Sequence, residues 1–106
     1  MMKKIMAKFS VGQTVCHKTY NYRGVIIDVD ATFQGKDKWY ERFARSRPSK
    51  NQPWYRILVH EAVSETYVAE GHLKPDFTGD PVNHPEISTF FDGFNEGIYL
   101  FNHVMN

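Results

Sequence analysis

Hydrophobic and polar residues alternate most regularly between Pro53 and Leu73. Two short apolar runs, residues 54–59 and 66–68, are separated by a polar stretch around Ala62–Ser64, which is typical of two strands joined by a turn. We therefore predict a β-hairpin. Most of one buried sheet face is expected to come from Trp54, Ile57, Val59, Tyr67, Val68 and Leu73.

The N-terminal part predicts a second hairpin. Residues 9–18 alternate loosely around a bend at Gly12, and residues 25–30 form a strongly β-branched run. Between them, residues 19–24 contain Asn and Gly, which tolerate the positive φ of a tight turn. With a short fifth strand near residues 72–74, we expect a mainly β protein, built on one curved sheet of about five antiparallel strands.

Two segments have the spacing of helices instead. Trp39, Tyr40 and Phe43 predict a short helical insertion over residues 35–47, which Pro48 would end. Nearer the C-terminus, apolar residues recur at i, i+3, i+4 and i+7, a stripe typical of a helix face. That stripe consists of Ile87, Phe90, Phe91 and Phe94. We therefore predict a C-terminal helix with an apolar tail over residues 83–106, which either folds back over the sheet or binds a partner.

Length and composition favour one soluble domain over residues 1–106. The chain has 42% hydrophobic and 15% aromatic residues, so a few large side chains would fill a small core. The single cysteine excludes an internal disulfide and favours a reducing compartment. Because no apolar run is long enough for a signal peptide or a membrane span, we expect a cytoplasmic protein without membrane contact.

The net charge of +1 hides a strong asymmetry. Residues 1–56 hold 12 Lys and Arg against 4 Asp and Glu, whereas residues 57–106 hold 1 against 8. Such asymmetry is typical of a polyanion-binding face, but it also arises when opposite charges meet and cancel in the folded domain. The basic part is concentrated in the insertion before Pro53.

The sequence gives little support for catalysis. The five histidines have no metal-ligand spacing, and Cys16 is expected to be a buried, inert thiol, so we expect no metal and no cofactor. Asp28 and Asp30 share a strand face, but the ordinary interpretation is that they face solvent at its end. We therefore expect a protein that is not an enzyme.

Four short motifs together carry a family resemblance. They are Val-Gly-Gln-Thr-Val-Cys-His-Lys (residues 11–18), Tyr-Arg-Gly-Val-Ile (22–26), Pro-Trp-Tyr (53–55) and Tyr-Val-Ala-Glu (67–70). Over about residues 8–74 the chain resembles the YccV-like hemimethylated-DNA-binding domain, that of bacterial heat-shock protein Q. Related domains occur in F-box proteins, which the tail from Asn83 resembles, and in adaptors of the Clp protease.

The resemblance implies a small SH3-like β-barrel over residues 8–74 and binding to hemimethylated DNA. It also implies an alternative, a protein-binding adaptor or specificity factor for an ATP-dependent protease of the Lon or Clp type, or for its substrates. The oligomeric state is left open.

Candidate contact residues follow from these two functions. Cations interleaved with aromatic rings are suited to tracking a phosphate backbone. The nucleic-acid candidates are Lys36, Lys38, Arg42, Arg45, Arg47 and Lys50 of the insertion, with Asn21 and Arg23 of the first hairpin. Tyr20 and Tyr22 at that hairpin tip could supply an apolar contact to a DNA methyl group. The protein-partner candidates are Phe90, Phe91, Phe94, Tyr99 and Phe101. For each of these three sets, the insertion aromatics, the residues at the hairpin tip and the tail residues, the alternative is that the side chains pack within the domain and contact no ligand.

Overall fold

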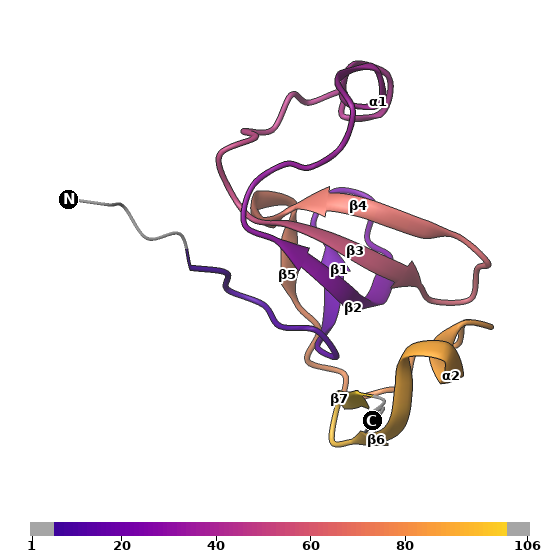
Figure 1. Ribbon diagram of the computed structural model, residues 1–106. Coiled ribbons are helices and arrows are strands. Elements are labelled where there is room, and N and C mark those ends of the chain that lie inside the picture. Colours follow the sequence, from indigo (N-terminus) through magenta and orange to yellow (C-terminus); the bar gives the residue numbers. More distant parts are fainter. Residues whose placement is uncertain (1–5, 102–106) are drawn as a thin grey trace, which may run out of the picture.

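A computed structural model describes residues 6–101, which form a five-stranded antiparallel sheet, a two-stranded sheet and three short helical turns (Figure 1). The strands of the large sheet are β1 (Thr14–His17), β2 (Arg23–Asp30), β3 (Trp54–Val59), β4 (Glu65–Ala69) and β5 (Leu73–Pro75). The remaining elements are α1 (Asp37–Phe43), the 3-10 turn η1 (Glu70–His72), α2 (Ile87–Phe90), β6 (Phe91–Asn95) and β7 (Ile98–Phe101).

The predicted mainly β fold with five antiparallel strands is confirmed, but the barrel is not closed. The strand order is β4-β3-β2-β1-β5, and both predicted hairpins are present. Closure would require a ladder between β4 and β5. Instead, all three residues of β5 pair with β1, so β4 remains an edge strand. No helix among residues 6–101 is long and apolar enough to cross a membrane.

Each face of the sheet supports its own hydrophobic cluster. One face buries a cluster of Phe9, Val15, Ile26, Tyr55, Ile57, Val68 and Leu73. The opposite face buries a cluster of Val25, Ile27, Leu58, Val82, Phe91 and Tyr99. Trp54 is also buried, but the prediction that it shares a face with Ile57 is wrong, because an odd spacing along a strand places two side chains on opposite faces.

The predicted C-terminal helix is only one turn long. After α2, the chain continues as the β6–β7 hairpin, so Phe91 and Phe94 lie on a strand. The reversal between the two strands is made by Glu96 and Gly97, whose φ angles of 50° and 82° belong to a tight two-residue hairpin turn. The tail thus folds back over the sheet, as one alternative predicted. Residues 102–106 of the predicted tail lie outside the described residues.

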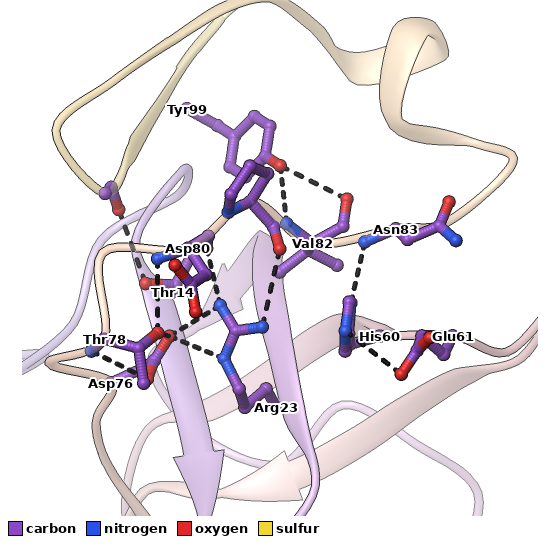
Figure 2. Close-up of polar contacts among 12 residues, drawn as sticks. Thr14, Arg23, His60, Glu61, Asp76, Thr78, Asp80, Val82, Asn83 and Tyr99 are labelled. Carbon is purple, nitrogen blue, oxygen red and sulfur yellow. Dashed lines mark hydrogen bonds and ion pairs between the residues drawn. The ribbon is translucent and has the colours of Figure 1, made fainter.

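A polar cluster fastens the segment before α2 to the sheet (Figure 2). The Nη2 and Nε groups of Arg23 both contact Oδ2 of Asp76, at 2.8 and 2.9 Å, and the guanidinium also donates to the carbonyls of Asp80 and Pro81. Burial alone would raise the pKa of Asp76, but the hydrogen bonds from Arg23 and Thr78 lower it below its usual value. This cluster fixes the path by which the chain reaches the C-terminal hairpin.

The helical insertion is shorter than predicted. The helix covers residues 37–43 rather than 35–47, and Ala44 follows it with non-helical angles. Arg47 then adopts a φ of 53°, and its N–H donates to the Ala44 carbonyl in a turn. Residues 44–50 therefore return to β3 as a loop, and Figure 1 shows α1 beyond the β4 edge of the sheet.

Candidate nucleic-acid interface

A groove of about 620 Å³ separates the insertion from the β1–β2 turn and runs along β4. Its volume is in the range of ligand sites in proteins. The residues that line it are His17, Thr19, Tyr20, Tyr22, Trp39, Phe43, Ala44, Arg45, Ser46, Pro48, Trp54, Glu65, Thr66, Tyr67, Val68, Ala69 and His72. Eight of these are aromatic or histidine side chains, so the groove has an aromatic lining.

The turn wall of the groove is organised around His17. Its Nδ1 accepts hydrogen bonds from the backbone N–H groups of Thr19 and Tyr20, both at 3.1 Å. Its ring stacks on those of Tyr22 and His72, at centroid distances of 5.2 and 5.7 Å. Burial, and then the neighbouring His72, lowers the pKa of His17, which favours the neutral ring. The turn is therefore fixed by an uncharged imidazole.

The insertion wall is held to the sheet by aromatic packing. The Phe33 ring contacts four others, those of Trp39, Tyr40, Trp54 and Tyr67, at centroid distances of 5.0 to 6.0 Å. Burial, and then the 2.7 Å hydrogen bond to the Asp30 carboxylate, raises the pKa of Tyr67 to about 12. The packing alternative is thus confirmed for Trp39 and Tyr40, since both contact Trp54 and anchor α1.

Two other rings at the groove face solvent. Tyr20 on the turn wall is 72% exposed, and Phe43 at the end of α1 is 60% exposed. The latter packs on one side against Trp39, at a centroid distance of 5.8 Å. Because large exposed aromatic side chains are costly in water, this pair marks the part of the groove best suited to stacking on a ligand.

Two of the six predicted insertion cations serve the insertion itself. The Lys50 ammonium lies 3.1 Å from Asp37 and 4.4 Å from the centroid of the Tyr40 ring. Arg47 donates to the carbonyls of Tyr40 and Glu41, and its guanidinium stacks over Tyr40. These interactions give both side chains a role in holding the loop after α1.

The other four cations are exposed. Arg42 lies over the Phe43 ring, 5.4 Å from its centroid, and Arg45 lines the groove. The side chains of Lys36, Lys38 and Arg45 make no ion pair or hydrogen bond with any residue of the described range 6–101. We call the four exposed cations of the insertion, Lys36, Lys38, Arg42 and Arg45, the basic rim; of these four, Arg45 lines the groove.

The two hairpin candidates lie in different surroundings. Asn21 is exposed at the turn with a φ of 57°, and its Oδ1 lies 3.7 Å from the sulfur of Cys16. This thiol is half-buried rather than buried, contrary to prediction. Arg23 is used by the polar cluster on the far side of β2, where its side chain is 18% exposed. Its ion pair with Asp76 leaves it poorly placed to meet a phosphate.

The predicted partner residues of the tail are mostly core residues. Phe91 and Tyr99 are 4% and 6% exposed, and Phe90 and Phe94 pack against the same cluster. The Tyr99 hydroxyl accepts from the Val82 N–H at 2.7 Å. Phe101 is 49% exposed, so of the five it is the most available to a partner.

Asp28 and Asp30, which the sequence places on one strand face, are engaged by other side chains. Within the described residues, no group of three or more His, Cys, Asp and Glu side chains is placed to hold a metal ion. Asp30 accepts from Tyr67, and Asp28 lies 3.8 Å from Arg56. The Arg56 guanidinium also binds Glu65 through two hydrogen bonds, which offsets the acidic charge beside the groove.

A comparison with protein-family models now adds to this geometry. Residues 7–98 match the family model described as "Hemimethylated DNA-binding protein YccV like". The chain belongs to the YccV-like family. The match extends beyond the four motifs, through α2 and β6 to the first residue of β7, so in this YccV-like domain α2 and β6 lie within the matched range.

All four cations of the basic rim of this YccV-like domain are candidates from the sequence, which did not reveal how the groove is built. The sequence did not indicate that His17 and His72 stack on each other in the turn wall, and the side of β4 that lies along the groove gave no distinct signal. One sequence feature could have indicated the groove: aromatic residues occur both in the β1–β2 turn and in the insertion. The fold brings these two segments to opposite walls of the groove. Lys18, exposed beside that turn, is a further cation near the groove end of β1 that is not among the sequence candidates.

Proposed function

We propose that this domain binds duplex DNA, with a preference for hemimethylated sites, through the aromatic groove and its basic rim. The observation that carries the proposal is the separation of charge in the fold. The insertion lies at one end of the molecule, and the C-terminal hairpin, which carries Asp92 and Glu96, lies at the opposite end (Figure 1). Opposite charges in the two regions therefore do not cancel by contact.

Membership of a family described as hemimethylated DNA-binding supports the same proposal. Lys36, Lys38, Arg42 and Arg45 would neutralise phosphates and release counterions. Tyr20 and Phe43 supply exposed apolar surface beside these cations, which is what reading a methyl group in the major groove requires. We further propose that the protein acts without catalysis in the cytoplasm. The protease-adaptor alternative stays a prediction.

The salt dependence of binding tests the role of the basic rim. We expect the double variant Arg42→Ala/Arg45→Ala to bind duplex DNA more weakly and to reduce the slope of log K against log salt by about 1 for each phosphate that the variant no longer neutralises. Fluorescence anisotropy at four salt concentrations measures both quantities. The matched control is Lys74→Ala, which removes an exposed cation on β5 that does not line the groove.

Methylation preference is measured in the same assay with one duplex in its unmethylated, hemimethylated and fully methylated forms. Tighter binding of the hemimethylated form, reduced by Tyr20→Ala or Phe43→Ala, supports the proposal. Equal affinity for all three forms would refute the preference. An unchanged salt slope in the double arginine variant would remove the rim from the contact surface.

A further inference from the structure

The strand β4 exposes an unused backbone edge inside the groove. Two hydrogen bonds fix its ladder with β3: Val59 N–H donates to the Ser64 carbonyl, and Glu70 N–H donates to the Pro53 carbonyl. Because bonded pairs in an antiparallel ladder recur at every second residue, Thr66 and Val68 bond to β3. The backbone groups of Glu65, Tyr67 and Ala69 consequently point away from β3.

Most of these outward groups have no partner within residues 6–101. No backbone or side-chain hydrogen bond of the described range reaches the N–H or C=O of Glu65 or Tyr67, or the N–H of Ala69, whereas the Ala69 carbonyl caps the 3-10 turn η1. All five residues of β4 line the groove, so this unpaired edge borders the cavity. We call it the open edge of β4.

Natural sheets usually protect such an edge with proline, inward-pointing charge, a bulge or a covering segment. β4 has no proline, and its register with β3 is regular over all five pairs. Its single charged residue, Glu65, is paired with Arg56. The insertion approaches the edge, through the 3.0 Å contact of Ser46 with His72, but leaves the groove between them. The insertion therefore hinders pairing of the open edge with the sheet of another molecule, but the groove leaves room for a single extended peptide.

The lining of the groove indicates which chain would fit. Apolar and aromatic side chains face the edge from both walls, through Tyr22 on the turn and Trp39 and Phe43 on the insertion. Arg45 contributes a cation to the lining, and Arg42 lies over the ring of Phe43, which also lines the groove. The lining carboxylate of Glu65 is paired with Arg56. Charge complementarity therefore selects an acidic partner with apolar side chains.

We propose that the open edge of β4 binds an extended acidic peptide segment of another protein by β-strand addition. Main-chain hydrogen bonds to Glu65 and Tyr67 and to the N–H of Ala69 supply affinity, and apolar side chains at alternate positions of the peptide enter the aromatic lining. In this proposal the peptide binds along β4, whereas DNA binds to the basic rim. Because both use Arg45, the peptide and duplex DNA compete.

Residue-resolved hydrogen exchange tests this mode directly. Random octapeptides displayed on phage are selected on the full chain, and the selected peptides are synthesised. In the free protein the amides of Thr66 and Val68 should exchange slowly and that of Tyr67 quickly. A saturating peptide should slow Tyr67 by about tenfold or more, because a new interstrand bond protects it. Selected peptides should be acidic, and N-methylation at alternate peptide positions should lower their affinity about tenfold.

A pair of protein variants provides the control. Glu65→Pro removes one outward N–H at the first position of β4, where proline is tolerated, while Glu65→Ala removes the same carboxylate and keeps the N–H. We expect the first to weaken peptide binding about tenfold relative to the second. If the proline variant fails to fold, the exchange measurement on the unmodified chain still decides.

Three results would overturn the proposal. The first is a selection in which no octapeptide binds above an unrelated control peptide. The second is a bound peptide that leaves the exchange of Tyr67 unchanged. The third is a duplex that protects Tyr67 as strongly as the peptide, which would assign the edge to DNA. Failure of DNA binding in the salt titration would leave the exchange result unaffected, so the two functions are tested separately.

Discussion

At the residue scale, Gly12 connects the two sheets. Its N–H donates to the Ile26 carbonyl on β2, and its own carbonyl accepts from the Tyr99 N–H on β7, both at 2.8 Å. Its φ of 92° lies in the left-handed region that favours glycine. A Cβ at this position would collide with the carbonyl oxygen of Tyr99. The bend predicted at Gly12 from sequence is therefore present, but its reason is the close approach of β7.

Substitution of Gly12 should be much more costly than that of a second glycine with similar angles. Gly79 has a φ of 74°, and a Cβ there would meet nothing within 4 Å. We expect Gly79→Ala to lower the free energy of unfolding by about 1 kcal/mol from backbone strain alone. Gly12→Ala adds a steric clash and should cost about 3 kcal/mol. Urea denaturation measures both, and equal costs would contradict the close approach.

His17 should make stability depend on pH. Its pKa in the folded protein is lowered, first by burial and then by His72, so between that value and 6.5 the unfolded chain binds more protons than the folded one. Lowering the pH through 6.5 therefore favours unfolding, and this part of the stability is fully present only above 6.5.

We expect the urea midpoint to fall from pH 7.5 to pH 5.5 and to fall less in the variant His17→Asn. Asparagine keeps an acceptor for the N–H groups of Thr19 and Tyr20 but does not titrate in this range. A variant with the same pH dependence as the unmodified protein would show that another group is responsible.

At the element scale, the C-terminal hairpin shows where periodicity misled the prediction. The spacing of Ile87, Phe90, Phe91 and Phe94 fits a helix face, but the local turn chemistry favours strands. Glu96-Gly97, between two short runs, is the two-residue signal of a hairpin, and Gly93 weakens a helix. Pairing with β7, which depends on the tertiary fold, outweighs the helical pattern.

The hairpin should contribute strongly to stability through one of its two paired phenylalanines. Phe91 and Phe101 are cross-strand partners, but they are 4% and 49% exposed. Phe91→Ala should lower the free energy of unfolding by about 3–5 kcal/mol, and Phe101→Ala by about 1 kcal/mol or less. Chemical denaturation measures both. Similar small losses for both variants would mean that the hairpin does not cover the core.

The insertion shows what the sequence could and could not specify. The spacing of Trp39, Tyr40 and Phe43 located the helix, because local periodicity reports which side chains share a face. It did not reveal that Phe33, which lies before the helix, is the ring that contacts both the helix and β3. Such long-range contacts depend on the register of β2 and β3, which short-range patterns do not fix.

At the scale of the whole molecule, the fold keeps the two charged regions apart. The ion pairs that join the basic and acidic halves of the sequence, Arg23 with Asp76 and Arg56 with Glu65, use none of the basic rim. The alternating pattern of the strands predicted the fold class, and the count of charged residues predicted that the chain has a basic and an acidic half. The groove itself was not predictable, because it is formed by the β1–β2 turn, the insertion and an edge strand that meet only in the folded domain.

The most direct test of DNA binding by the groove is a map of backbone amide chemical shifts during titration with a hemimethylated duplex. We predict that the largest changes fall in the β1–β2 turn, residues 18–22, and in the insertion, residues 36–46, with little change in β6 and β7. Addition of salt should reverse them, because counterion release weakens phosphate contacts. Changes concentrated in the C-terminal hairpin, or none at duplex concentrations that saturate binding, would contradict the account.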